Sequence, residues 1–330
     1  MEFDQAAYIE LYNKERKKVD LILNRAFSKR KPRSLYEPSE YIIKGKGKRI
    51  RPLLVLLSAK LVGGNFDDAY NAAAAVELLH NFTLVHDDIM DNADKRRGRL
   101  TVHTKYDEST AILAGDSLLS IAYEYLLKDC DGNSKLILDS FTKGLIEVCE
   151  GQSLDKEYES KKRVSLDEYL VMIKKKTASM IKMCCEVGAI LGEGNNKEIN
   201  GLAAYGLNLG IAFQIQDDLL DIIAEEKKFG KKIGGDLVEG KKTYLFIKAL
   251  EKSSGKDRNS LNNIIQNKGI RINQVEKYKA LYQKLNVIED AKKAINYYTE
   301  RALKSLSVIG EGKDRNILIW LADSLVKRNK

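Results

Sequence analysis

The three prolines of this 330-residue chain all lie within its first 52 residues. Proline interrupts helix interiors, because its ring removes a backbone N–H and clashes with the preceding turn. The absence of proline from the rest of the chain therefore permits a succession of long helices. Segments rich in strong helix formers, such as Ala72–Leu79 and Ala111–Leu127, agree with this interpretation.

No segment shows the sustained alternation of apolar and polar residues that marks a strand, so we expect no β-sheet. Helices should end at segments rich in glycine, asparagine and serine: 63–65, 131–133, 192–196, 234–236 and 253–255. We find no short repeat and no flexible linker. The sequence predicts one all-α domain over residues 1–330, built as a bundle of long helices.

The composition narrows the class of protein. Hydrophobic residues make up 44%, enough to bury a core. The first residues lack a basic start followed by an apolar stretch, so we expect no signal peptide. The longest uncharged segment, 201–216, is shorter than the roughly 20 apolar residues of a membrane span. Four cysteines without C-x-x-C spacing and three histidines argue against zinc and against disulfides. We expect a soluble, cytoplasmic protein.

The net charge of +9, from 56 basic and 47 acidic residues, favours anionic partners. Nucleic acid, a membrane surface and phosphorylated substrates all meet that description. Charge alone does not choose among them, so the choice depends on local motifs.

Two aspartate clusters share the spacing D-D-x-x-D: Asp87, Asp88 and Asp91, and Asp217, Asp218 and Asp221. Residues three and four apart share a helix face, so the carboxylates of each cluster repel one another. A cation compensates this repulsion most simply, and oxygen ligands select a hard ion such as Mg²⁺. A lone D-D-x-x-D is more often an exposed acidic face. Here each cluster directly follows an apolar segment, which favours metal sites.

Further polar residues align with the clusters. At about 3.6 residues per turn, His80 falls in one narrow stripe with Asp87 and Asp91, and Gln214 falls in a stripe with the second cluster. Gly210 lies on that second face one turn earlier, which predicts open space beside it. Polar stripes on apolar helices predict that the bundle surrounds a central cavity lined by both clusters.

Basic groups accompany the acidic ones, as a metal–diphosphate site requires for the oxygens that metals leave free. They are Lys48 and Arg51 in the loop Gly45–Pro52, the segment Arg96-Arg97-Gly98, Lys176 with Thr177, and Lys231, Lys232, Lys241 and Lys242. Pro52 suits the first position of the following helix. Each group alone is typical of a surface. Their order beside the aspartates predicts a metal-dependent enzyme acting on a diphosphate.

Together the motifs closely resemble those of the trans-prenyltransferases, the short-chain isoprenyl diphosphate synthases of the polyprenyl synthetase family. They are GKGKRIRP, HNFTLVHDDIMDNADKRRG, GQSLD, KTAS, FQIQDDLLD and GKKIGGDLVEGKKT, in the family's order over nearly the whole chain. The sequence departs from the family pattern at two positions. Lys46 stands where a glycine is common, and Leu100 stands where a proline usually follows RRG. Neither departure removes a charged ligand. The resemblance implies the isoprenoid synthase fold, small-molecule diphosphate substrates and a homodimer.

The resemblance also implies residue roles. Three Mg²⁺ ions, with Mn²⁺ as a substitute, would be held by the six aspartates when substrate is bound. The diphosphate of isopentenyl diphosphate would be bound by Lys48, Arg51, His80 and Arg97. The allylic diphosphate would be bound by Arg96, Lys176, Thr177, Gln214, Lys231 and Lys241. We prefer Lys231 to Lys232 because Gly230-Lys231 matches the family's glycine–lysine pair.

The implied reaction is head-to-tail condensation. Metals and cations neutralise the leaving diphosphate, the allylic carbon–oxygen bond ionises, and the double bond of isopentenyl diphosphate attacks that carbon. The released pyrophosphate accepts the proton, and apolar walls exclude water. Phe82 and Thr83, near the first cluster, bear on chain length. One aromatic and one small residue match archaeal-type geranylgeranyl diphosphate synthases, so we predict a C20 product. C15 and C25 products are the alternatives, and Phe82 could instead be a core aromatic.

Other classes fit less well. A terpene cyclase or head-to-head synthase usually lacks paired GKxxRP and RRG groups, because a cyclase has no second diphosphate to bind. Lys48, Arg51 and Arg97 therefore disfavour the cyclase. The six aspartates disfavour a non-catalytic helical subunit. The sequence contains no recognised nucleic-acid motif, so we expect no nucleic-acid partner and no transmembrane segment.

Overall fold

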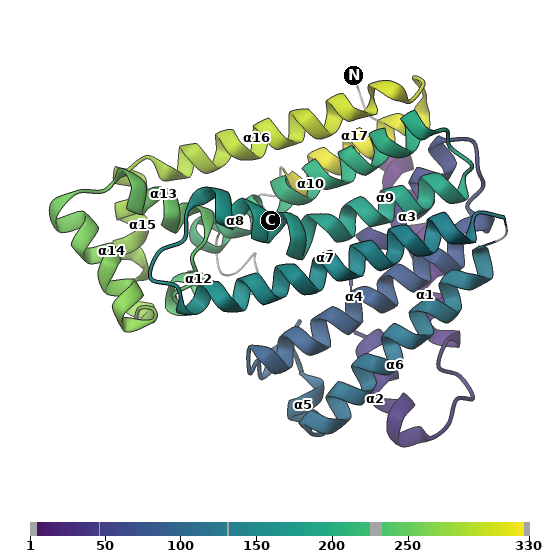
Figure 1. Ribbon diagram of the computed structural model, residues 1–330, viewed down its shortest axis with the longest axis horizontal. Coiled ribbons are helices and arrows are strands. Elements are labelled where there is room, and N and C mark those ends of the chain that lie inside the picture. Colours follow the sequence, from purple (N-terminus) through teal and green to yellow (C-terminus); the bar gives the residue numbers. More distant parts are fainter. Residues whose placement is uncertain (1–4, 46, 131, 225–232, 327–330) are drawn as a thin grey trace. The chain divides into compact units, whose positions relative to one another are not determined.

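The computed structural model describes residues 5–45, 47–130, 132–224 and 233–326 (Figure 1). These residues are almost entirely helical, which confirms the all-α class. They form two compact units. Unit 1 comprises Met1–Thr142, Met183–Ala203 and Val308–Ile317, and unit 2 comprises Lys143–Lys182, Ala204–Ser307 and Leu318–Lys330. That residues 1–330 act as one domain stays a prediction.

Unit 1 contains the N-terminal elements: α1 (Gln5–Arg25), α2 (Arg33–Ile43), α3 (Ile50–Leu61), α4 (Tyr70–Met90), β1 (Lys95–Arg96), β2 (Arg99–Leu100), α5 (Val102–Lys105) and α6 (Glu108–Leu126). Its core is built on α4, whose segment Ala72–Leu79 is buried. This helix packs side by side with α6 and also contacts α3 and α1 (Figure 1). The core therefore fixes the end of α4, where the first aspartate cluster lies.

Unit 2 contains α8 (Leu166–Ile173), a π-helical turn (Lys174–Ala178), α12 (Gly235–Val238), α13 (Tyr244–Lys252), α14 (Gly255–Asn267), α15 (Val275–Lys284) and α16 (Val287–Ser305). Four helices contribute residues to both units: α7 (Ser134–Ser160), α9 (Ser179–Leu191), α10 (Asn196–Ile223) and α17 (Lys313–Val326). Within unit 2, α13 contacts α8, α14 and α16. This packing places the start of α13 beside the second aspartate cluster on α10.

The predicted helix ends agree with the structure in most places. The helix α3 ends at Leu61 before the Gly63-Gly64 pair, and α9 ends at Leu191 before Gly192. Pro52 is in the first turn of α3 but at its third position rather than its first, because the helix begins at Ile50. Proline is tolerated there since the first N–H groups of a helix have no partner within it.

The expectation of no sheet is wrong at one place. Lys95–Arg96 and Arg99–Leu100 form a short antiparallel hairpin. Its two turn residues, Arg97 and Gly98, have φ of 52° and 76°. Positive φ at both central positions is typical of a tight hairpin turn, in which glycine is favoured. Strands of two residues are too short to produce the alternation by which strands are recognised in a sequence.

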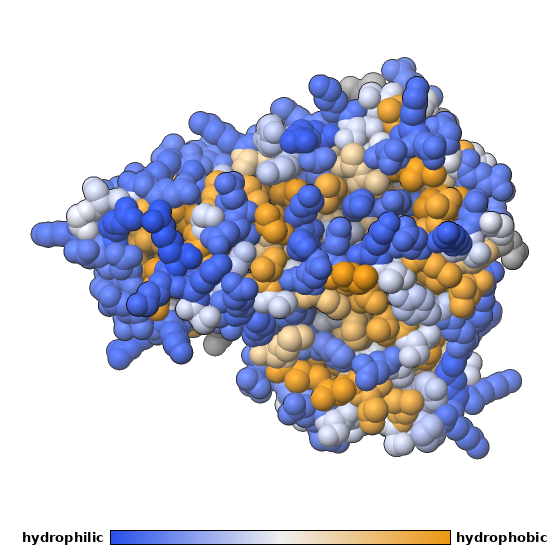
Figure 2. Space-filling model, viewed as in Figure 1, coloured by the Kyte–Doolittle hydropathy of each residue, from blue (hydrophilic) through white to orange (hydrophobic). Residues whose placement is uncertain are grey.

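The surface in Figure 2 is mainly hydrophilic on the face shown, with apolar patches between the charged side chains, one of them over α6. Ile112 and Leu113 of α6 are exposed. Among the helices that the structure describes, none is long and apolar enough to cross a membrane.

Candidate functional site

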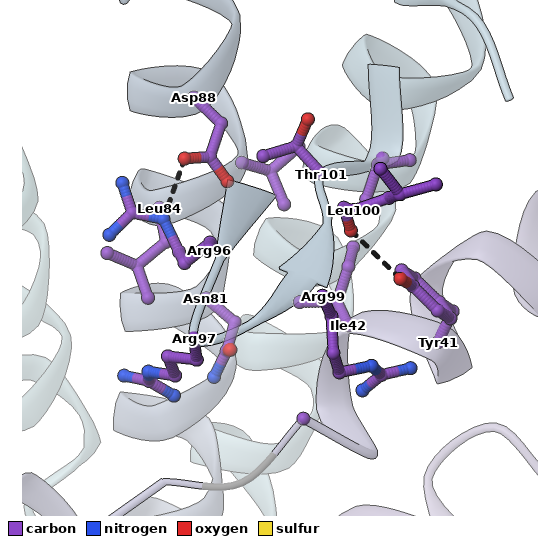
Figure 3. Close-up of a pocket in the computed structure, with 13 residues that line it drawn as sticks. Tyr41, Ile42, Asn81, Leu84, Asp88, Arg96, Arg97, Arg99, Leu100 and Thr101 are labelled. Atoms are coloured by element: carbon purple, nitrogen blue, oxygen red, sulfur yellow. Dashed lines mark hydrogen bonds and ion pairs between the residues drawn. The ribbon is translucent and has the colours of Figure 1, made fainter. Parts of the chain in front are cut away.

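The first aspartate cluster lies at the end of α4. Asp87 and Asp88 belong to the last turn of the helix, and Asp91 caps it. Asp88 is buried, and the Nε of Arg96 donates a hydrogen bond to its Oδ1 at 2.7 Å (Figure 3). Burial raises the pKa of Asp88, and the ion pair with Arg96 opposes this rise. Asp87 is half-buried and Asp91 is exposed, so the middle residue is the most buried of the cluster.

The hairpin after this cluster forms one wall of a pocket within unit 1 (Figure 3). Asp88, Arg96 and Arg97 line it together with residues of α2. The hydroxyl of Tyr41 on α2 donates a hydrogen bond to the carbonyl of Leu100 at 2.8 Å, which ties the hairpin to α2. Leu100, one of the two departures from the family pattern, is thus a strand residue, while the other, Lys46, lies outside the described residues.

Arg51 and His80 are in contact, with Nη1 of the arginine 3.3 Å from Nε2 of the imidazole. His80 is buried. Burial, and then Arg51, Arg97 and Arg96, lower its pKa well below the usual value. Arg97 is exposed as a residue, yet desolvation of its guanidinium lowers its pKa too, as do the neighbouring arginines. A neutral histidine among crowded guanidinium groups favours an anionic ligand.

Arg49 has a role that the sequence reasoning missed. It adopts a left-handed conformation with φ of 50°, and its side chain is buried. The guanidinium donates to Asp20 at 2.9 Å, to Glu77 at 2.7 Å and to the carbonyl of Ile43 at 2.9 Å. These bonds fix the loop that carries Lys48, whose side chain is exposed. A run of basic residues does not reveal which of its members binds protein.

The two residues assigned to chain length, Phe82 and Thr83, each contact a residue one helical turn away on α4. Phe82 is buried, and its ring centroid lies 4.6 Å from that of His86. Gly115 on α6 admits this imidazole, because a Cβ there would lie 2.4 Å from its Nε2. Thr83 donates its hydroxyl hydrogen bond to the carbonyl of His80 at 2.8 Å. The sequence reasoning overlooked His86, although its i, i+4 spacing from Phe82 predicts the contact.

The second aspartate cluster lies on α10, and its middle residue is again held by protein. Asp218 is buried and accepts three hydrogen bonds, from the hydroxyl of Tyr169 at 2.6 Å, the backbone N–H of Tyr244 at 3.0 Å and the amide of Gln214 at 3.0 Å. Burial raises the pKa of Asp218 to about 6, and the hydrogen bonds oppose this. Asp217 and Asp221 are half-buried.

Gly234 and Asp236 lie beside this cluster. The backbone N–H of Gly234 donates to the carbonyl of Asp221 at 2.7 Å, and the N–H of Asp236 donates to its carboxylate at 3.1 Å. Burial, followed by repulsion from Asp218 and Asp221, raises the pKa of Asp236 to about 8. The sequence reasoning gave Asp236 no role of its own, although its segment was predicted as a helix break and belongs to the motif GKKIGGDLVEGKKT.

Lys176 and Thr177 lie in the π-helical turn. The ammonium of Lys176 forms an ion pair with Asp155 of α7, and the hydroxyl of Thr177 donates to Gln214 at 2.9 Å. All four residues line a second pocket, which lies within unit 2. The prediction that Gly210 leaves open space beside the second cluster is wrong. A Cβ there would lie 2.5 Å from the Cα of Ala178, so this glycine admits a neighbouring backbone rather than leaving open space.

The remaining predicted lysines that the structure describes, Lys241 and Lys242, differ in the groups that they bind. Lys241 lines the second pocket and pairs with Glu239 at 2.7 Å. Lys242 lines it as well, but its ammonium donates to two backbone carbonyls at the end of α7, at 2.7 and 3.1 Å. Lys231 and Lys232 lie outside the described residues.

The donor set at each cluster suits a hard metal ion that also binds substrate. Within the described ranges, no three carboxylate, imidazole or thiol groups form a preformed metal site. Mg²⁺ is usually held by one or two carboxylates plus substrate phosphates rather than by an all-protein cage. In each cluster the two outer aspartates are at least partly exposed and lie one turn apart. That both clusters line one cavity stays a prediction.

Comparison with known proteins gives a consistent result. The model of the family described as polyprenyl synthetase matches residues 32–285. The short chain isoprenyl diphosphate synthase of Methanothermobacter thermautotrophicus is 38% identical over 323 residues, which is 97% of this chain and 98% of that protein.

Solved structures agree in fold. The crystal structure of geranylgeranyl pyrophosphate synthetase from Pyrococcus horikoshii Ot3 has a TM-score of 0.90 and 37% identity, covering 98% of this chain and 99% of that one. A polyprenyl synthase from Caulobacter crescentus CB15, complexed with calcium and isoprenyl diphosphate, has a TM-score of 0.90 and 26% identity. The match covers 100% of this chain and 99% of that one. The chain belongs to the polyprenyl synthetase family.

Proposed function

We propose that the protein condenses isopentenyl diphosphate head-to-tail with an allylic diphosphate. One observation carries the proposal: a cluster of Arg51, His80 and Arg97 accompanies the first aspartate cluster in unit 1. An enzyme that ionises a single allylic diphosphate needs no such additional anion site. Membership of the polyprenyl synthetase family supports the same reaction.

We assign metal binding to the outer aspartates of the two clusters: Asp87, Asp91, Asp217 and Asp221. Mg²⁺ is the ion that this donor set suits best, and Mn²⁺ can replace it. When bound, the metal neutralises charge on the leaving diphosphate. The relative that binds calcium with isoprenyl diphosphate supports a divalent ion beside this substrate class.

The middle aspartates have a different role in this proposal. Asp88 orients Arg96, and Asp218 joins α8, α10 and the start of α13. A buried carboxylate that already accepts protein hydrogen bonds has less capacity for a metal ion, and its burial raises the pKa. These two residues therefore position ligands rather than bind metal.

The diphosphate of isopentenyl diphosphate is bound by Lys48, Arg51, His80 and Arg97 in this assignment. Guanidinium groups bind phosphate oxygens in a bidentate manner. His80 is neutral, because its pKa is lowered, so it contributes a hydrogen bond and no charge. The bonds of Arg49 to Asp20 and Glu77 keep that arginine away from the ligand and fix the loop instead.

The allylic diphosphate is bound by Arg96, Lys176, Thr177, Gln214, Lys231 and Lys241. For the described members in unit 2, the support is that they line one pocket with Asp218. Lysine and arginine side chains stabilise the charge that develops on the leaving diphosphate. The released pyrophosphate accepts the proton after condensation, so the reaction requires no side-chain base.

We propose geranylgeranyl diphosphate, C20, as the product, with C15 and C25 as the alternatives. The pairing of buried Phe82 with the small Thr83 near the first cluster supports it, and so does the name of the Pyrococcus horikoshii relative. We further propose a cytoplasmic homodimer. Ile112 and Leu113, neighbours on α6, are both exposed, and contiguous exposed apolar surface often marks an interface, which supports the dimer.

Pyrophosphate release tests the proposal. The protein should release pyrophosphate only when isopentenyl diphosphate, an allylic primer and Mg²⁺ are all present, and a chelator should abolish release. Release from the allylic primer alone would indicate a cyclase-type ionisation instead. The absence of release under every condition would contradict the proposed function. Size-exclusion chromatography with light scattering tests the dimer, and a monomer would contradict it.

A further inference from the structure

The π-helical turn Lys174–Ala178 lies between α8 and α9 and carries Lys176 and Thr177, two residues that line the second pocket. Turns of this kind are rare and are frequently found at functional sites. The loss of regular α-helical hydrogen bonds must be offset by contacts from outside the turn. Two neighbouring helices, α7 and α10, provide such contacts.

Gly151 of α7 lies directly against the backbone of the turn. A Cβ at this position would lie 2.1 Å from the backbone nitrogen of Lys176 and 2.5 Å from its Cα. Carbon atoms pack at about 3.5–4.0 Å, so only glycine permits this approach. Residues of α7 on either side of Gly151 bind lysines of the same turn. Glu150 forms an ion pair with Lys175, and Asp155 forms one with Lys176.

Gly210 of α10 meets the turn in the same way. A Cβ there would lie 2.5 Å from the Cα of Ala178 and 2.7 Å from its Cβ. Four residues later, Gln214 accepts the hydrogen bond of the Thr177 hydroxyl at 2.9 Å. Residues four apart lie on the same helix face. Both helices thus combine a glycine that admits the backbone with a polar residue, one turn on, that binds a side chain.

We propose that Gly151 and Gly210 are positioning residues for the condensation. They seat the π-helical turn so that Asp155 holds the ammonium of Lys176 and Gln214 holds the hydroxyl of Thr177 at the second pocket. The inference rests on the proposed function, which assigns Lys176 and Thr177 to the allylic diphosphate. Glycine has no side chain to contact a substrate, so its contribution is the placement of the turn.

Gly151→Ala tests this inference in the full-length protein. The added Cβ displaces the turn, so the KM for the allylic primer should rise about tenfold or more. The KM for isopentenyl diphosphate should stay within about twofold, because its ligands lie in unit 1. An unchanged KM for the primer, or an equal rise in both KM values, would overturn the inference.

Gly192→Ala is the matched control. A Cβ at Gly192 would lie 2.3 Å from the carbonyl oxygen of Ala59, a clash of similar severity within unit 1. This variant should lower the melting temperature without a selective rise in the KM for the primer. If it reproduces the selective rise, the effect of Gly151→Ala is general destabilisation, and the inference fails.

Asp155→Asn separates positioning from folding, because it keeps the side-chain shape and introduces no clash. It should raise the KM for the primer alone. Combined with Gly151→Ala, it should add little, because both changes act through Lys176 and contacting residues are not additive. Full multiplication of the two effects, or a wild-type KM in Asp155→Asn, would contradict the inference. The single variant decides the matter if Gly151→Ala does not fold.

Calorimetric titration with inorganic pyrophosphate and Mg²⁺ makes the test independent of turnover. Gly151→Ala should bind pyrophosphate about tenfold more weakly than Gly192→Ala does. Equal binding by these two variants would refute the positioning role alone. Failure of the wild-type protein to turn over prenyl substrates, with the difference in pyrophosphate binding preserved, would refute the proposed function alone.

Discussion

The hydroxyl of Tyr169 donates a hydrogen bond to Asp218 at 2.6 Å, and both side chains are buried. The first N–H of α13 and the amide of Gln214 donate to the same carboxylate. In the first cluster, Asp88 is likewise buried and held by Arg96. The two D-D-x-x-D motifs therefore have the same internal division, with a buried middle residue and outer residues that are more exposed.

Tyr169→Phe should destabilise the protein and slow the reaction. The change removes one donor from a buried carboxylate, at a cost of about 1–3 kcal/mol in the free energy of unfolding. Looser placement of Asp218 should lower kcat about tenfold. Urea unfolding and turnover at saturating Mg²⁺ measure the two effects. Tyr123→Phe, which removes a longer hydroxyl contact with Thr142 at 3.2 Å, is the control and should have little effect. Wild-type behaviour of Tyr169→Phe would show that the network is dispensable.

Asp87→Asn and Asp88→Asn should differ in their metal dependence. Loss of an outer carboxylate should raise the Mg²⁺ concentration at half-maximal rate about tenfold or more. Loss of the middle charge should release Arg96 and raise the KM for the allylic primer, while the Mg²⁺ requirement stays close to that of the wild type. Titration of Mg²⁺ at saturating substrate distinguishes the two variants. An equal shift in both would contradict the positioning role of Asp88.

The protonation of His80 should make the free energy of unfolding depend on pH. Burial and the neighbouring arginines lower its pKa well below the usual value. The imidazole is therefore protonated more readily in the unfolded chain. The folded state loses stability as pH falls through about 6.5, by up to about 1.4 kcal/mol per pH unit. His80→Gln removes this contribution. Between about pH 7 and about pH 5, urea unfolding should show the wild type losing more stability than the variant. Equal losses would mean that His80 is not held neutral.

Product length should respond to the residues before the first cluster. Phe82→Ala removes the ring that packs on His86 and should yield products longer than those of the wild type. Thr83→Phe adds bulk at the neighbouring position and should shorten them. Chromatography of dephosphorylated products measures both. The Ala variant loses a buried ring, at a cost of about 3–5 kcal/mol, so its melting temperature is recorded alongside. An unchanged product distribution in both variants would contradict the assignment of Phe82 and Thr83 to chain length.

The features predicted well from the sequence depend on local chemistry. The confinement of proline to the first 52 residues predicted the helical class, and the glycine segments predicted the ends of α3 and α9. The motifs predicted the family, which the match over residues 32–285 confirms. Helical spacing placed Asp87 and Asp88 on one helix, and Asp217, Asp218 and Asp221 on another.

The features that were missed depend on contacts between distant residues. Asp88 and Asp218 look the same as their neighbours in the sequence, and only tertiary packing buries them. Arg49 stands in a basic loop, yet it binds Glu77, a residue 28 positions away. Gly210 appeared to leave space, because a sequence does not show which backbone approaches a glycine. The hairpin at Arg97 and Gly98 depends on positive φ rather than on strand propensity.

Incorporation of labelled isopentenyl diphosphate tests the central claim most directly. The protein is incubated with Mg²⁺ and, in separate reactions, with C5, C10 and C15 allylic primers, and the labelled products are sized. We predict label in prenyl diphosphates that extend the primers, with C20 as the main end product. Labelled products that end at C15 or C25 would contradict the C20 assignment. No incorporation with any primer would contradict the assignment as a prenyltransferase.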